Sequence, residues 1–189
     1  TRTLPSAVYA FLQVPGGEPF AGDPRQVLKR VLARAAAAGY TFYISPEIEF
    51  FYFKDQNGTE PLDSGGYFDL LPIDRGEETR RDIVNALEAM KIEGEAAHHE
   101  VAPGQHEIDF KYGEAVATAD AVVTFRFVVK KVALMHGLHA TFMPRPPAGV
   151  NGSGMHVHQS LFTSDGANAF YDADAPWQIS QIGRSYIAG

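Results

Sequence analysis

The chain has 189 residues, of which 45% are hydrophobic and 21% are charged, a composition typical of a globular protein with at least one sizeable domain. Its net charge of −7 argues against non-specific binding of nucleic acid, which needs a basic surface. The absence of cysteine excludes disulfides and thiolate metal sites and is typical of a cytoplasmic protein. No apolar run approaches the length of a membrane span, and the first residues lack the pattern of a signal peptide.

The first half of the chain predicts strands around one helix. Residues 6–14 (SAVYAFLQV) alternate and are rich in aromatic and β-branched residues, which predicts a strand. Asp23 followed by Pro24 predicts the N-cap and first turn of a helix that ends at Gly39. Strand residues follow from Tyr40, with an interruption expected at Pro46, up to a hairpin-type turn in residues 55–60 (DQNGTE).

The second half alternates helices with short strands. Residues 65–76 (GGYFDLLPIDRG) indicate an irregular segment, and the apolar spacing that follows predicts a helix ending before Gly94. The remaining expected elements are extended segments at 93–101 and 105–112 around the turn APGQ, a long helix at 114–136, strands at 138–144 and 155–162, a hairpin turn at 163–172, and a last helix starting at Asp174 and Pro176. Strands joined by short turns predict an α+β fold with a mostly antiparallel sheet.

Two histidines stand on alternate residues after a glycine-rich turn, in the stretch NGSGMHVHQS. On a strand, His156 and His158 point to the same face, because side chains alternate with period two. Gly152 and Gly154 suit a backbone that reaches positive φ or lets a ligand approach closely. Metal ligands, phosphate contacts and ordinary hydrogen-bonded polar groups all remain open for the two imidazoles.

Carboxylates occur in pairs on two other segments. Glu47 and Glu49 share one face of an aromatic-rich strand, where like charges repel unless the face is solvated or a cation lies between them. Glu100 and Glu107 flank a tight turn, which is either a polar hairpin tip or a place where both face a common point. Together, carboxylates and histidine indicate a site for magnesium or manganese, with nucleotide phosphates completing the coordination.

Four motifs carry a family resemblance: PEIEFF, GGYFDLLPID, HHEVAPGQHEIDF and NGSGMHVHQSLF. In order and spacing, and across nearly the whole chain, they resemble the catalytic domain of class I glutamine synthetase, the ATP-dependent ligase that joins ammonia to glutamate. The resemblance implies that residues 1–20 are the end of the N-terminal β-grasp domain. It also implies that residues 21–189 are the catalytic domain without its C-terminal part.

The resemblance implies two sites for Mg²⁺ or Mn²⁺. Glu49, Glu100 and Glu107 match the ligands of the tighter metal, which orients glutamate and ammonia. Glu47 and His156 match two ligands of the second metal, which bridges the ATP phosphates. We therefore count Glu100 and Glu107 as catalytic as well as metal-binding.

The substrates are implied in the same way. His158 matches the catalytic histidine that contacts the transferred phosphate, and Asn151 and Gly152 match the loop that holds glutamate. The expected nucleotide-binding residues are those at matching positions, namely Glu95, Tyr112, His158 and Ser160. Among these, the assignments of Glu95, Tyr112 and Ser160 rest on spacing more than on motif identity.

The resemblance also implies an activity and an assembly. ATP phosphorylates the γ-carboxylate of glutamate, and ammonia then displaces phosphate from the γ-glutamyl phosphate intermediate. Full chains of the family form stacked hexameric rings, and a piece that lacks the other domain and several substrate-binding arginines is expected to be inactive alone. The alternatives are a γ-glutamyl ligase of the same superfamily that uses another amine, a non-catalytic structural relative, and an unrelated metal hydrolase with the same Glu and His cluster.

Overall fold

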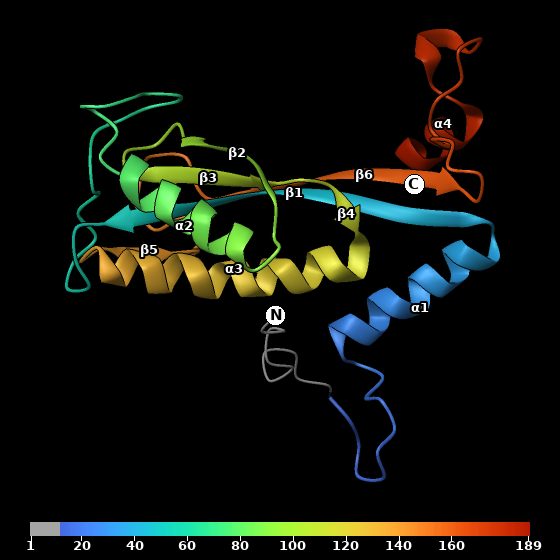
Figure 1. Ribbon diagram of the computed structural model, residues 1–189. Coiled ribbons are helices and arrows are strands. Elements are labelled where there is room, and N and C mark those ends of the chain that lie inside the picture. The colour runs from blue at the N-terminus through green and yellow to red at the C-terminus, as the bar shows by residue number, and fades with distance from the viewer. Residues whose placement is uncertain (1–11) are drawn as a thin grey trace. The chain divides into compact units, whose positions relative to one another are not determined.

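The computed structural model describes residues 12–189, so most of the strand predicted at 6–14 lies outside the described residues. Helices and strands both occur, and the sheet is mostly antiparallel, which confirms the predicted α+β class (Figure 1). The helices are α1 Pro24–Ala37, α2 Glu77–Ala89, α3 Ala115–Met135 and α4 Gln181–Ala188. The strands are β1 Tyr40–Phe53, β2 Gly94–His99, β3 Gln105–Phe110, β4 Gly113–Glu114, β5 His139–Thr141 and β6 Met155–Thr163. Among the described helices, none has the length and apolar character needed to cross a membrane.

The sheet is organised around β1. The strand order is β2-β3-β1-β4, and β5 and β6 also pair with β1. The pairs of β1 with β3, β4 and β5, and of β2 with β3, are antiparallel. Because β1 is central, its side chains meet neighbours from several distant parts of the chain.

The described chain forms two compact units. One contains residues 12–44, 112–119 and 158–189, and the other contains residues 45–111 and 120–157. The second unit holds the main apolar core. Alternate residues of β1 and β3 pack there against α2 and α3, and the largest buried members are Phe50, Tyr52, Ile83, Leu87, Ile108, Phe110 and Phe125.

The sequence predicted a break in the strand at Pro46, and this prediction is wrong. β1 runs without interruption through this residue. The register with β4 ends at Ile44 and that with β3 begins at Glu47, so Pro46 falls between the two ladders. Because a proline costs a strand mainly its missing N–H donor, this position tolerates it.

The helix ends follow local capping chemistry. The Asp23 side chain accepts a hydrogen bond from the Arg25 N–H at 3.0 Å, and Gly39 has φ +87, so both predicted ends of α1 are confirmed. The last helix starts later than predicted. Pro176 begins only a 3₁₀ turn, because Trp177 has a left-handed φ of 57, and Ser180 caps α4 through its hydroxyl.

Gly104, in the turn between β2 and β3, packs closely against the backbone of β1. Its φ is +66, and a Cβ there would lie 2.8 Å from the Tyr52 carbonyl oxygen. We expect Gly104→Ala to lower the free energy of unfolding by about 2 kcal/mol or more, through the left-handed backbone and the clash together.

The matched control is Gly137, which has φ +75 and where a Cβ would meet no other atom within 4 Å. Gly137→Ala should lower the free energy of unfolding only through the left-handed backbone, by about 1 kcal/mol. Urea denaturation of both variants measures the difference, and equal losses would contradict the role of the contact.

Candidate functional site

One face of the sheet carries acidic side chains in two neighbouring rows. Glu49 on β1 stands opposite Glu107 on β3, and Glu47 stands opposite Asp109. Their neighbours in sequence, such as Ile48 and Ile108, belong to the apolar core. Strand alternation therefore separates the main apolar core, on one face, from the carboxylates on the other face, where the smaller buried cluster of Phe51 and Phe53 also lies.

Glu107 lies at the meeting point of two groups of potential ligands. In one, ligand atoms of His98, Glu100 and Glu107 lie within 4.8 Å of one another. In the other, the same holds for Glu47, Glu107 and His156. The His98 Nε2 lies 3.0 Å from Glu107 Oε2, and His156 Nδ1 lies 3.3 Å from Glu47 Oε2. The turn between β2 and β3 thus brings Glu100 and Glu107 to a common point.

The carboxylates crowd one another. Burial is the largest cause that raises the pKa of the Glu107 carboxyl to about 8, and the charges of Asp109, Glu100 and Glu49 add to it. Burial, followed by the charge of Glu47, raises the pKa of Asp109 to about 6. One oxygen of each, Glu107 Oε1 and Asp109 Oδ1, is buried without a hydrogen-bond partner. These oxygens are suited to a hard divalent cation, which would also offset the repulsion.

Glu49 is held by the glycine-rich loop and by Gln105. The Gln105 side-chain amide donates to Glu49 Oε2 at 2.6 Å and to the Gly152 carbonyl at 2.9 Å. The Glu49 N–H donates to the Gly154 carbonyl at 3.3 Å. A Cβ on Gly154 would lie 3.0 Å from Glu49 Oε1, and one on Gly152 would lie 2.3 Å from the Pro144 carbonyl oxygen. Neither glycine has a positive φ, so that predicted reason for them is wrong, and the atoms that exclude a Cβ at both positions belong to the protein itself.

The structure places the other predicted residues as follows. Asn151 is exposed beside Gly152, and Glu95 is exposed on β2, where its charge adds to the raised pKa of Asp109. Tyr112, His158 and Ser160 belong to the other compact unit. Tyr112 is 61% exposed there, and its ring contacts that of Tyr43 edge to face.

Two residues that the sequence analysis assigned no role belong to the site, Gln105 and Asp109. Both alternate with Glu107 on β3 and therefore point to the same face. That period-two spacing was the available signal. His98, which the sequence placed only near the carboxylates, contacts Glu107 directly.

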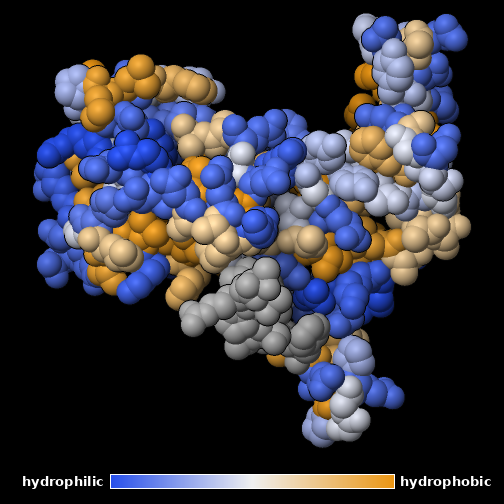
Figure 2. All heavy atoms as spheres, viewed as in Figure 1, coloured by the Kyte–Doolittle hydropathy of each residue, from blue (hydrophilic) through white to orange (hydrophobic). Residues whose placement is uncertain are grey.

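An apolar loop lies next to His98. The Phe68 ring stacks on the imidazole with a centroid distance of 4.3 Å, and the Tyr67 ring meets it edge to face at 5.5 Å. The same loop between β1 and α2 exposes Leu70, Leu71 and Ile73. Figure 2 shows these hydrophobic side chains as the orange group at the upper left.

Comparison with known proteins places this chain in a family. The family model described as the catalytic domain of glutamine synthetase matches residues 21–189. The chain belongs to this family. The predicted resemblance to glutamine synthetase is thereby confirmed.

Individual relatives agree with the family model. The glutamine synthetase of Thermus thermophilus is 61% identical over 180 residues, which cover 93% of this chain and 40% of the relative. That of Methanosarcina mazei is 55% identical over 180 residues with the same coverage. The cryo-EM structure of Plasmodium falciparum glutamine synthetase matches with a TM-score of 0.86 at 26% identity, covering 93% of this chain and 41% of that chain. The chain thus spans about 40% of the length of these relatives.

Proposed function

We propose that the protein containing this chain joins ammonia to glutamate at the expense of ATP, through a γ-glutamyl phosphate intermediate. The observation that carries the proposal is the convergence of Glu47, Glu107 and His156 with Glu100 on one face of a glutamine synthetase catalytic domain. Glutamate, ammonia and ATP are the substrates in this proposal, and Mg²⁺ or Mn²⁺ is the cofactor.

The donor set fits divalent cations. Carboxylate oxygens dominate it, one imidazole from His156 joins it, and the buried Glu107 Oε1 has no hydrogen-bond partner. In the proposal, Glu49, Glu100 and Glu107 hold one ion, and Glu47 and His156 hold the second. When bound, such ions supply positive charge against the negative charge of the phosphates.

The remaining residues bind and orient the substrates. Asn151 and Gly152 hold glutamate, and the hydrogen bond from Gln105 to the Gly152 carbonyl keeps that loop beside Glu49. His158 contacts the phosphate being transferred, while Glu95, Tyr112 and Ser160 contact the nucleotide. Because an acyl phosphate hydrolyses in water, the aromatic rings of Tyr67 and Phe68 beside His98 have a use in limiting access of water.

The amine is the least constrained part of the proposal, so the test varies the amine. Phosphate release by the full-length protein is followed with ATP, glutamate and Mg²⁺, supplying ammonia, methylamine or a polyamine. We expect release with ammonia and its loss in Glu100→Gln.

Release with another amine alone would replace glutamine synthesis by a different γ-glutamyl ligation and would leave the site assignment intact. No release with any amine, by a protein that still binds Mg²⁺, would overturn the ligase proposal.

A further inference from the structure

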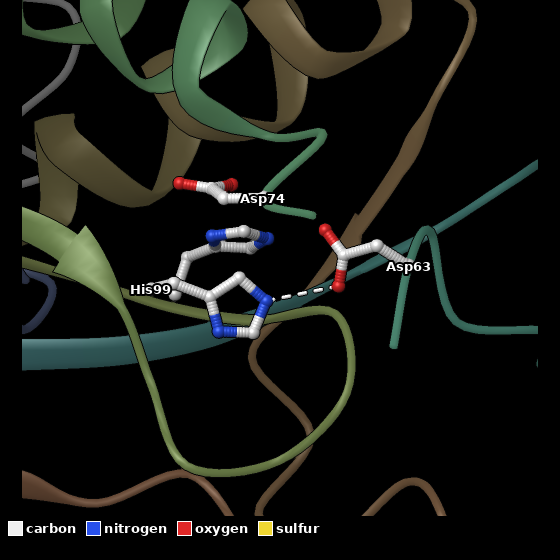
Figure 3. Close-up of side chains that lie close together, drawn as sticks. Asp63, Asp74 and His99 are labelled. Atoms are coloured by element: carbon white, nitrogen blue, oxygen red, sulfur yellow. Dashed lines mark hydrogen bonds and ion pairs between the residues drawn. The ribbon is translucent and has the colours of Figure 1, made fainter. Parts of the chain in front are cut away.

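A second group of titratable side chains lies in the same unit, apart from the carboxylate site. Ligand atoms of Asp63, Asp74, His99 and His106 lie within 4.8 Å of one another, and both histidine rings are fully buried. Figure 3 shows Asp63 directed toward the ring of His99, with Asp74 beside them. The arrangement resembles a metal site in composition, so its contacts decide what it does.

Arg80 already supplies a cation to half of this group. Its guanidinium forms a paired contact with the Asp74 carboxylate, at 3.0 Å to Oδ1 and 2.6 Å to Oδ2. The same guanidinium lies 2.7 Å from His106 Nδ1, which is an acceptor because the ring is buried and its pKa is lowered well below the ordinary value. A buried arginine among these donors leaves the group without the free ligands that a metal ion needs.

The other half is a chain of hydrogen bonds that leads to Glu100. His99 Nε2 lies 2.9 Å from Asp63 Oδ1, and His99 Nδ1 lies 2.6 Å from the backbone carbonyl oxygen of Glu100. A carboxylate and a carbonyl only accept, so both ring nitrogens donate. The ring is also confined sterically, since a Cβ on Gly65 would lie 2.6 Å from His99 Nε2.

Asp63 extends this hold to the far side of the turn between β2 and β3. Its Oδ1 accepts from the Gly104 N–H at 3.0 Å and from the Gly65 N–H at 3.2 Å. Its Oδ2 accepts from the Arg75 N–H at 3.0 Å. One carboxylate, with 1% of its side chain exposed, therefore ties the segment 63–75 to both ends of the turn that carries Glu100.

The backbone of Glu100 is consequently fixed on both sides. Its N–H donates to the Gln105 carbonyl at 2.8 Å, and its own carbonyl accepts from His99. The Glu100 side chain has one oxygen bonded to the Val101 N–H at 2.8 Å. Ligand geometry tolerates errors of only about 0.5 Å, so a shift of this turn would misplace the carboxylate.

We propose that Asp63, acting through His99 and Gly104, is a positioning residue for Glu100 and thereby sets the affinity of the carboxylate site for Mn²⁺ or Mg²⁺. This inference rests on the proposed metal-binding function. Residues that orient metal ligands from behind typically change metal affinity about 10- to 100-fold when they are altered.

The test is the Mn²⁺ dissociation constant of the full-length protein, measured by calorimetry on wild type, Asp63→Asn and Asp74→Asn. Asp74→Asn is the matched control, because Asp74 is a buried carboxylate of the same group that bonds Arg80 and the Gly76 N–H rather than the turn. We expect Asp63→Asn to weaken Mn²⁺ binding about 10- to 100-fold, and Asp74→Asn to change it less than about threefold. Circular dichroism confirms that each variant is folded.

A second variant, His99→Gln, tests the proposal if Asp63→Asn does not fold. It should weaken Mn²⁺ binding by a factor in the same range. Unchanged affinity in either folded variant would overturn the positioning role, as would an equal loss in Asp74→Asn. Metal affinity is measured without turnover, so a wild-type protein that binds Mn²⁺ but makes no glutamine would count against the proposed function alone.

Discussion

Replacing Glu107 with glutamine is expected to weaken Mn²⁺ binding more than about 100-fold, because Glu107 belongs to both groups of potential ligands and even indirect support of a ligand is worth 10- to 100-fold. The same change is expected to stabilise the metal-free protein at alkaline pH. The first effect follows from the loss of a ligand, and the second from the burial of Glu107 together with the charges of the carboxylates around it. At alkaline pH and without a bound cation, the wild-type protein is therefore expected to be less stable than the Glu107→Gln variant.

The pH dependence has a definite sign. The pKa of Glu107 in the folded chain is raised to about 8, whereas an ordinary glutamate titrates near 4.3 in an unfolded chain. Between these values the folded state holds a proton that the unfolded state has released, so the free energy of unfolding falls as pH rises. Glutamine does not titrate, and its amide can donate to the neighbouring carboxylates. We expect Glu107→Gln to gain on the order of 2 kcal/mol over wild type above about pH 8, and little near pH 4.

Urea denaturation in the presence of a chelator, at several values between about pH 5 and about pH 9, measures this difference. Calorimetric titration with Mn²⁺ at neutral pH measures the loss of binding. The control is Glu88→Gln on the exposed side of α2, which should change neither quantity. A Glu107→Gln protein that is less stable than wild type across the whole range would refute the crowding argument.

Local patterns predicted much of the fold. The sequence predicted that Glu47 and Glu49 share one face of a strand, and in β1 they alternate with Ile48 and Phe50 of the apolar core. Such a pattern is local, since it follows from the two-residue period of a strand. The capping of α1 by Asp23 followed from the same kind of short-range chemistry.

Long-range pairing was beyond these patterns. Nothing local shows that β3 lies between β1 and β2, and this placement is what puts Glu107 between Glu49 and His98. The expected break at Pro46 was wrong for a related reason. Whether a proline interrupts a strand depends on whether a neighbouring strand needs its N–H, and here the ladders of β4 and β3 leave a gap at that residue.

Helix α3 shows the same limit for packing. Among its apolar residues, Phe125 and Val129 are fully buried, while Val123 is 56% exposed and Met135 is 73% exposed. The helix carries apolar residues on more than one side, so periodicity alone does not select the side that meets the sheet. The selection comes from the aromatic residues of β1 and β3 against which Phe125 packs.

Truncation of Phe125 on α3 is accordingly expected to cost much of the stability of the fold. Its ring is fully buried and packs edge to face against three others, Phe50, Phe110 and Phe142, at centroid distances of 6.0, 5.2 and 5.7 Å. Phe125→Ala removes these contacts and leaves a cavity between α3 and the sheet. We expect a loss of about 3–5 kcal/mol in the free energy of unfolding.

Phe127 offers a matched control on the same helix, since it is the same residue type but is 70% exposed. Phe127→Ala should cost about 1 kcal/mol or less in this chain, because little apolar surface returns to water. Urea denaturation of the two variants compares the losses directly. Phe125 packs against β1 and β3, and the opposite face of these strands carries Glu49 and Glu107. Its truncation is therefore also expected to disturb the strands that position the site. Similar losses at both positions would show that α3 does not meet the sheet through Phe125.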